Sequence, residues 1–276
     1  MSSVAEESPL TKALSLAQQS AQAFTTSTGI DHVDLAIVLG SGWGRALDLI
    51  GEPLCTVPAN EVPGFSSSTV AGHHGTIQVL AAADKKILVI GARSHFYEHR
   101  DVHRSVHPVR FAHYLGAKDL ILTNGCGSLN PHWEPGQVVM LRDHINLTFV
   151  SPLLGPEFVD LSQAYSPKLR AIAHEQYPYL PSGIYAQFAG PQYETPAEVS
   201  MAGIVGADLV GMSTVQETVA ARHLGLEVLG LSLVTNLAAG ISPQPLSHQE
   251  VLGIGQDNAN QISELLARIV TAILKA

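Results

Sequence analysis

The sequence is poor in cysteine and in charge, and it contains no long apolar run. Its 276 residues include two cysteines, Cys55 and Cys126, and 14% of them are charged. Two cysteines are too few for a disulfide framework, and no Cys/His set has zinc-finger spacing. No apolar stretch approaches the roughly 18 residues that a membrane-spanning helix needs. The acidic, polar segment from Met1 to Pro9 is not typical of a signal peptide.

The charge balance excludes a further class of partner. Lys and Arg number 15 against 24 Asp and Glu, which gives a net charge of −9. Such a balance argues against broad contact with the phosphate backbone of nucleic acids. We therefore expect a cytoplasmic globular protein with no membrane or nucleic-acid partner, whose low charge indicates some apolar surface buried against another subunit.

The sequence does contain short, β-branched apolar runs that alternate with segments of helical period. The runs predict strands at 35–39, 87–90, 120–123, 138–141, 209–212 and 228–235, and the periodic segments predict helices at 10–26, 102–115, 167–176, 196–205, 215–224 and 248–274. This alternation predicts one α/β domain over residues 1–276, with helices on both faces of a largely parallel or mixed sheet. Residues 1–30 form its N-terminal helical segment, and 146–166 form a long loop, which is more often functional than idle.

Glycine-rich turns follow the predicted strands, where ligands of α/β sheets bind. The first, Gly40–Gly44 with Ser41, allows backbone N–H groups to approach an anion. Arg45 stands where a dinucleotide fingerprint requires glycine, and no P-loop lysine follows. A tight strand-to-helix turn is the structural alternative, but the Ser41 hydroxyl favours a phosphate group.

The second strand end carries Arg93 and His95, which are two residues apart and can project to one side as an oxyanion clamp. Upstream, the Ala71–Gly75 turn holds His73 and a neighbouring histidine, a pattern that is more often a surface turn than a ligand contact. The third end is Asn124–Ser128, where Cys126 could serve as a nucleophile. A small buried hydrophobe is the favoured interpretation of Cys126, because no local base accompanies it.

Three helix starts have capping-box spacing, which explains their glutamates structurally. The pairs are Thr195 with Glu198, Thr214 with Glu217, and Ser247 with Glu250. The residues beside these boxes stay unexplained by capping. Glu194 could accept hydrogen bonds from a ligand, Ser213 lies beside orphan N–H groups that favour an anion, and His248 lies in a first turn that favours neutral imidazole.

Histidine spacing raises a metal site as an alternative. His95, His99, His103 and His107 are four residues apart and would stack on one face of a continuous helix. Pro108 and the turn-like residues 98–100 argue against such a helix, and no H-E-x-x-H motif is present. We therefore expect no metal.

Taken in order, these motifs resemble the trimeric, low-molecular-mass purine nucleoside phosphorylases. The resemblance runs from Leu35 to about Gly255 through GSGWG, AGHHG, GARSHFYE, LTNGCG, the Tyr193–Pro196 box, GMSTVQE, VTNLAAG and SHQEVL. It implies a single-domain, three-layer α/β/α fold around a mixed, distorted sheet, and a homotrimer. It also implies phosphate-dependent cleavage of purine nucleosides in purine salvage, with inorganic phosphate as co-substrate and no cofactor.

The resemblance assigns roles by position. Phosphate would be held by Ser41, His73, Arg93, His95, the Gly125 backbone and Ser213. The purine would meet Glu194 and Asn236, with Tyr193, Val210, Met212 and Thr235 around it, and the ribose would meet Tyr97, Met212 and His248. Phe158 would resemble an aromatic residue that reaches the ribose in a neighbouring subunit's site. Asn236, His95 and Glu194 are the predicted catalytic residues.

Two departures and three alternatives remain at this point. Cys126 and Gly125 stand where the family often has alanines, and Leu237 stands where animal members often have lysine. Asn236, rather than the aspartate usual in methylthioadenosine phosphorylases, favours inosine and guanosine. The alternatives are an adenosine or methylthioadenosine phosphorylase, a hydrolase with a Cys126 nucleophile, and a non-catalytic nucleoside-binding protein. The sequence ranks neither inosine against guanosine nor a trimer against a hexamer.

Overall fold

A computed structural model describes residues 7–44, 47, 49–66, 75–242 and 247–276, with the backbone alone of 248, 250 and 251. The described residues form strands β1 (Leu35–Val38), β2 (Glu52–Pro58), β3 (Thr76–Ala82), β4 (Lys85–Ile90), β5 (Asp119–Ser128), β6 (Val138–Asn146), β7 (Ser182–Gln187), β8 (Leu209–Gly211) and β9 (Glu227–Leu237). The helices are α1 (Pro9–Thr28), α2 (Phe96–His99), α3 (Val102–Ser105), α4 (His107–Tyr114), α5 (Pro167–Gln176), α6 (Pro196–Ile204), α7 (Val215–His223), α8 (His248–Asp257) and α9 (Ala259–Lys275). None of these helices is long and apolar enough to cross a membrane.

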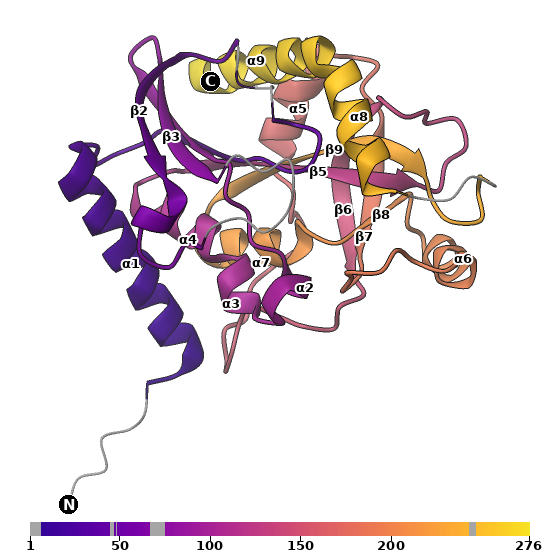
Figure 1. The fold of residues 1–276 in the computed structure, drawn as a ribbon, viewed down its shortest axis with the longest axis horizontal. Helices are drawn as coiled ribbons and strands as arrows, with labels where there is room; N and C mark the ends of the chain where they lie inside the picture. The colour runs from indigo at the N-terminus through magenta and orange to yellow at the C-terminus, as the bar shows by residue number, and fades with distance from the viewer. Residues whose placement is uncertain (1–6, 45–46, 48, 67–74, 243–246) are drawn as a thin grey trace, which may run out of the picture.

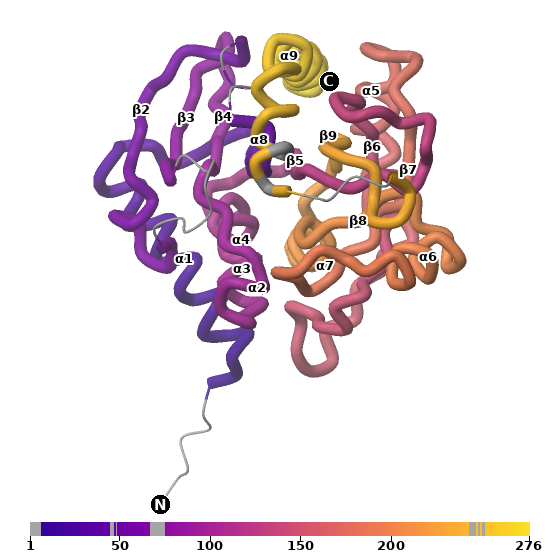
Figure 2. The backbone as a smooth tube through the Cα atoms, turned by 45° about the vertical axis from the view of Figure 1, so that its right-hand side comes forward, coloured from indigo at the N-terminus to yellow at the C-terminus, as the bar shows by residue number. Residues whose placement is uncertain are grey.

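The strands form one mixed sheet that bends back on itself. Their order is β2-β3-β4-β1-β5-β8-β7-β6-β9, and β9 also pairs with β5. β1 runs parallel to β4 and β5, whereas β8 runs antiparallel to β5 and β9 antiparallel to β6. Figure 2 shows β5 between the β2–β4 half and the β6–β9 half of the molecule. The predicted mixed, distorted sheet is confirmed, and the second pairing of β9 is the source of the distortion.

Helices cover both faces of this sheet, as predicted (Figure 1). One core cluster joins alternate side chains of β1 and β4 to Phe24 of α1, Phe111 of α4 and Val215 of α7. The opposite cluster joins the other side chains of the same strands to Leu169 of α5 and Leu266 of α9. A strand whose two faces are both covered must be apolar throughout, which is why β1 is an uninterrupted Leu-Ala-Ile-Val run.

Three strands and two helix breaks were not predicted. β2 contains Pro53 and Pro58 and is largely exposed, so it lacks the apolar pattern of a buried strand. β3 and β7 also escaped prediction, because polar residues interrupt them. The predicted 102–115 helix is wrong as one element. Pro108 cannot continue a helix from α3, so α4 begins anew at His107.

The predicted C-terminal helix is likewise two helices, α8 and α9. Asn258 lies between them with a φ of −103° and a ψ of 10°, and its side-chain Nδ2 donates to the Ile254 carbonyl at 2.9 Å. The backbone N–H of Asn258 donates to the same carbonyl at 3.1 Å, so backbone and side chain share one acceptor at the residue that separates α8 from α9.

Candidate active site

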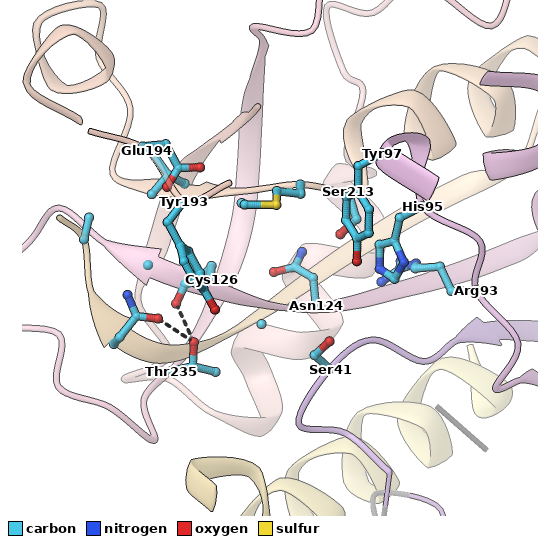
Figure 3. A pocket seen from close by; sticks show the side chains of 17 residues that line it. Ser41, Arg93, His95, Tyr97, Asn124, Cys126, Tyr193, Glu194, Ser213 and Thr235 are labelled. Carbon is cyan, nitrogen blue, oxygen red and sulfur yellow. Dashed lines mark hydrogen bonds between the residues drawn. The ribbon is translucent and has the colours of Figure 1, made fainter. Parts of the chain in front are cut away.

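One pocket gathers most of the residues that the sequence had marked. It opens where β4, β5, β8 and β9 end, beside the first turns of α2 and α7. Its walls include Ser41, Arg93, His95, Tyr97, Gly125, Tyr193, Glu194, Val210, Met212, Ser213, Thr235 and Asn236. Figure 3 shows Tyr193, Glu194 and Thr235 at one end and Ser41, Arg93 and His95 at the other. The pocket is therefore two-ended: one end rich in nitrogen donors, the other carrying a carboxylate and an amide.

The Ser41 turn is fixed to the neighbouring strand. The Gly40 N–H donates to Thr123 Oγ1 at 2.9 Å, and the Trp43 indole donates to the Asn124 carbonyl at 2.9 Å. A Cβ at position 40 would collide with the backbone of Thr123 and Asn124. Glycine is thus required at Gly40 because the turn passes directly over β5, and this contact presents Ser41 to the pocket.

Arg93 is buried and paired. Its Nε donates to Glu217 Oε1 at 3.0 Å, its Nη2 to Glu217 Oε2 at 3.0 Å, and its Nη1 to the Thr123 carbonyl at 2.6 Å. The side chains of Arg93 and Glu217 are 1% and 4% exposed. A bidentate pair of this kind fixes the guanidinium plane as well as its position. The arginine of the predicted oxyanion clamp therefore has its positive charge balanced by the Glu217 carboxylate.

The N-terminus of α7 differs from the prediction of orphan N–H groups beside Ser213. The Val215 and Gln216 N–H groups both donate to Gln187 Oε1, at 3.0 and 3.2 Å, and the Thr214 N–H donates to Glu217 Oε2 at 2.9 Å. That prediction was wrong. Gln187, at the end of β7, accepts from these N–H groups, and it is too far away in the sequence for the local pattern to reveal the contact. Ser213 itself lines the pocket, and its N–H lies 3.4 Å from the Tyr185 hydroxyl.

His95 and Tyr97 form a stacked pair at the same end. Their ring centroids are 4.9 Å apart, with planes inclined by 10°. The Glu98 carboxylate accepts from the His95 N–H at 2.6 Å and lies 3.2 Å from His95 Nδ1. Burial, aided by the Glu98 charge, raises the pKa of Tyr97 to about 12, so its hydroxyl stays a neutral donor or acceptor near pH 7.

At the other end, Glu194 immediately precedes α6. The predicted capping box is present: the Thr195 N–H donates to Glu198 Oε2 at 2.8 Å, and the Glu198 N–H donates to Thr195 Oγ1 at 3.2 Å. Glu194 takes no part in it and is 8% exposed. Its Oε1 is buried without a hydrogen-bond partner among the described residues, and burial raises the pKa of the carboxyl group. A buried acceptor of this kind suits a ligand N–H.

Asn236 lies opposite on β9 with its amide turned onto its own strand. Its Nδ2 donates to the Leu237 carbonyl at 2.9 Å, and its Oδ1 accepts from Thr235 Oγ1 at 2.9 Å. A Cβ at Gly127 would lie 3.2 Å from Nδ2. These are weak local bonds on a partly buried side chain, so the amide can turn toward a ligand at modest cost.

Cys126 lies in the pocket wall but is unsuited to nucleophilic attack. Its thiol is buried and lies 3.4 Å from the Leu233 carbonyl as a donor. Burial raises the pKa of the thiol, whereas a nucleophilic cysteine needs a lowered one. The hydrolase alternative fails on this geometry, and Cys126 is the small buried hydrophobe that the sequence favoured.

One predicted site residue lies outside the pocket, and two others are not described. Phe158 is 95% exposed on the surface and does not line this chain's pocket. His73 lies outside the described residues, as does the side chain of His248. His95, His99, His103 and His107 fall on three separate short elements or their caps, and the described part of the chain holds no cluster of three metal-ligating side chains.

Two residues that make polar contacts at the site had not been assigned to it. Asn124 lines the pocket from within β5, which continues to Ser128 instead of ending at Thr123 as predicted. The capping-box spacing identified Glu217 as a helix cap but gave it no role at the site. Nothing in the sequence could connect it to Arg93, which lies 124 residues earlier.

Residues 34–271 match the model of the phosphorylase superfamily. A purine nucleoside phosphorylase of Cellulomonas is 56% identical over 95% of both chains, and one of Mycobacterium tuberculosis is 50% identical over 92% of this chain and 95% of its own. The crystal structure of Schistosoma mansoni purine nucleoside phosphorylase with adenosine superposes with a TM-score of 0.84 at 32% identity, covering 92% of this chain and 95% of that one.

The fold is that of an α/β nucleoside phosphorylase. Within the phosphorylase superfamily, this chain belongs to the purine nucleoside phosphorylases, which are pentosyltransferases.

Proposed function

We propose that the chain cleaves 6-oxopurine ribo- and deoxyribonucleosides, inosine and guanosine, with inorganic phosphate to give the free base and the pentose 1-phosphate. The observation that carries the proposal is the two-ended pocket itself. Side chains that can donate to an oxyanion line one end of the cavity, and a carboxylate and an amide that can pair with the edge of a purine line the other end. Purine salvage is the corresponding cellular role.

Phosphate belongs at the Arg93 end. Ser41, Arg93, His95, Ser213 and the Gly125 N–H supply hydrogen-bond donors there, and we assign His73 to the same end. Donors already in place cost little reorganisation when the nucleophile binds. Tyr97, Met212 and His248 would contact the ribose between the two ends. The sugar develops oxocarbenium character as the bond to the base breaks, and the held phosphate attacks it from one face.

The purine belongs at the Glu194 end, between Tyr193, Val210, Met212 and Thr235. The ionised Glu194 carboxylate accepts from N1–H, and from the exocyclic amine when the base is guanine. The Asn236 amide, once turned from Leu237, meets the N7/O6 edge, where negative charge develops on the leaving base. An amide offers both donor and acceptor, as that edge requires. Neither a metal nor a redox cofactor has a step in this chemistry.

The long loop after β6 fits a role between subunits. Phe149, Leu154 and Phe158 are all exposed on it, and three large apolar side chains exposed on one loop favour contact with another subunit. We propose a homotrimer in which Phe158 reaches the ribose region of a neighbour's pocket. Sedimentation of the wild type and of Phe158→Ala tests this. A loss of activity at unchanged assembly supports a role in the site, whereas full activity contradicts it.

The function is tested by incubating the protein with inosine, guanosine, adenosine and methylthioadenosine, each with and without phosphate. We expect base release from the first two only, and only with phosphate. The similar Schistosoma mansoni enzyme was crystallised with adenosine. Faster turnover of adenosine than of inosine and guanosine would therefore overturn the 6-oxopurine assignment. Binding without base release would indicate a non-catalytic protein.

Asn236→Ala isolates the leaving-group interaction. We expect kcat/KM for inosine to fall by about 2–4 kcal/mol of transition-state stabilisation, because the amide acts where charge develops. The measurement is steady-state phosphorolysis at saturating phosphate. Near-wild-type turnover would remove Asn236 from the mechanism.

A further inference from the structure

Glu217 connects two parts of the phosphate end. Its Oε1 accepts from Arg93 Nε, and its Oε2 accepts both from Arg93 Nη2 and from the Thr214 N–H. All three bonds measure 2.9–3.0 Å, and the carboxylate is almost wholly buried. One carboxylate therefore sets both the plane of the Arg93 guanidinium and the backbone that follows Ser213.

The backbone that Glu217 holds is strained. Thr214 has a φ of +80° and a ψ of −46°, and the Val215 N–H donates to the Ser213 carbonyl at 3.0 Å. These values define a γ-turn of the rare positive-φ kind, at a β-branched residue that avoids such angles. Strained conformations of this sort persist only where the surroundings over-determine them.

Other contacts restrain the same turn. Asn124 Nδ2 donates to Thr214 Oγ1 at 2.9 Å, and Thr218 N donates to the Thr214 carbonyl at 2.8 Å. Neither of these contacts reaches Arg93. Among the described residues, Glu217 alone bonds both to Arg93 and to the Ser213–Thr214 turn.

Arg93 keeps donors for a ligand. Three of its five N–H groups bond to Glu217 and to the Thr123 carbonyl, and no described residue accepts the other two. Because the guanidinium is held on two sides, these N–H groups have a fixed direction. The backbone of Ser213 is held by the turn, so the distance between its Cα and the guanidinium is fixed as well.

We propose that Glu217 is a positioning residue that fixes Arg93 and Ser213 relative to each other, so that both meet one phosphate ion in its bound orientation. This proposal rests on the proposed function. An argument from net charge alone predicts the opposite effect of Glu217 on phosphate affinity. Glu217 neutralises Arg93, so removing the carboxylate would strengthen phosphate binding if net charge dominated the site.

The test compares Glu217→Gln and Glu217→Asp with the wild type. Glutamine can serve in a capping box, so it keeps the Thr214 bond but breaks the bidentate contact with Arg93. Aspartate keeps the charge, but its shorter side chain cannot reach Arg93 and Thr214 together. Glu227→Gln is the matched control, because Glu227 pairs with Arg222 at the far end of α7 at 3.0 Å, outside the pocket.

Initial rates are measured with phosphate varied at saturating inosine, and then with inosine varied at saturating phosphate. We expect the phosphate KM to rise about 10–100-fold in both Glu217 variants, as a misplacement of about 1 Å can produce. The inosine KM should stay within about threefold of the wild type, because the purine end is untouched. Glu227→Gln should match the wild type in both constants.

An unchanged or lowered phosphate KM in Glu217→Gln would overturn the proposal, as would an equal rise in both constants. If Glu217→Gln fails to fold, Glu217→Asp decides, since it retains the charge beside Arg93. Should the wild type and Glu227→Gln both lack phosphorolysis, the proposed function fails by itself. The positioning role is then tested by the rise in Tm that inorganic phosphate gives. A rise in the wild type that Glu217→Asp loses supports the role, and equal rises or none in either protein reject it.

Discussion

Helices α6 and α7 begin with the same threonine-to-glutamate capping box, but the two boxes have different surroundings. Thr195 and Glu198 of α6 are exposed, and Thr195 has ordinary extended angles. Thr214 and Glu217 of α7 are buried, and Thr214 is strained at positive φ. In each case the residue just before the cap, Glu194 or Ser213, lines the pocket.

The difference shows how one local motif can serve two purposes. At α6 the box lies exposed at the start of the helix, and among the described residues Glu198 hydrogen-bonds only to Thr195. At α7 the same geometry is combined with a long-range ion pair to Arg93. Because both partners of this ion pair are buried, removing Glu217 would leave the Arg93 charge unpaired in the interior, which costs far more free energy than an unpaired charge in water. The second box therefore affects the stability of the site, whereas the first does not.

The largest expected effect separates the two boxes by stability. Glu217→Ala should lower the free energy of unfolding by about 3–5 kcal/mol, because it leaves the buried Arg93 guanidinium without its counter-ion. Glu198→Ala should lower it by only about 0.3–1.5 kcal/mol, the usual contribution of an exposed cap. Urea unfolding followed by circular dichroism measures both. Equal losses would show that Arg93 finds another partner and that burial does not distinguish the boxes.

The next effect separates the two pocket-facing residues by substrate. Glu194→Gln should lower kcat/KM for inosine by about 1.5–3 kcal/mol, because a charged acceptor for N1–H becomes a neutral one. The phosphate KM should be unchanged, since Glu194 lies at the purine end. Initial rates with each substrate varied in turn provide the measurement.

Ser213→Ala is the reciprocal variant. It removes a hydroxyl donor at the phosphate end, so the phosphate KM should rise by the equivalent of about 1.5 kcal/mol while the inosine KM holds. If both variants changed the same constant, the two ends of the pocket would not be separate subsites.

The smallest effect is a pH dependence. Burial raises the pKa of Glu194 above its ordinary value of 4.5. The proton occupies the carboxylate below that raised pKa and blocks acceptance from N1–H. The inosine KM should therefore rise as pH falls, beginning above pH 4.5 and by up to about tenfold per unit once the group is protonated. In Glu194→Gln this acid limb should vanish. Its persistence would assign the limb to another group.

Much of the fold followed from local pattern. The apolar runs of β1, β4, β5, β6, β8 and β9 located six strands, because strands covered on both faces must be apolar throughout. β2 was missed for the converse reason: it is exposed and contains prolines. The breaks near Pro108 and at Asn258 were missed because the apolar period continues through both positions, although the helix does not.

The candidate site divided in the same way. Ser41, Arg93, Glu194 and Ser213 were found because each stands at a strand or helix end, and the structure brings them to one pocket. The assignment of roles within that pocket still rests on the proposed reaction. Gln187 was missed because it lies on β7, 28 residues before the α7 N–H group that it accepts from, and no local sequence pattern indicates that contact.

The sequence by itself determined which residues carry chemistry and which cap helices, since strand ends, glycine turns and capping boxes are local patterns. Only the tertiary structure decided that Arg93 is neutralised, that Thr214 is strained and that Cys126 is buried beside Leu233. Those facts depend on β4, α7 and β9 meeting around β5, where burial and long-range pairing set the energy of each group.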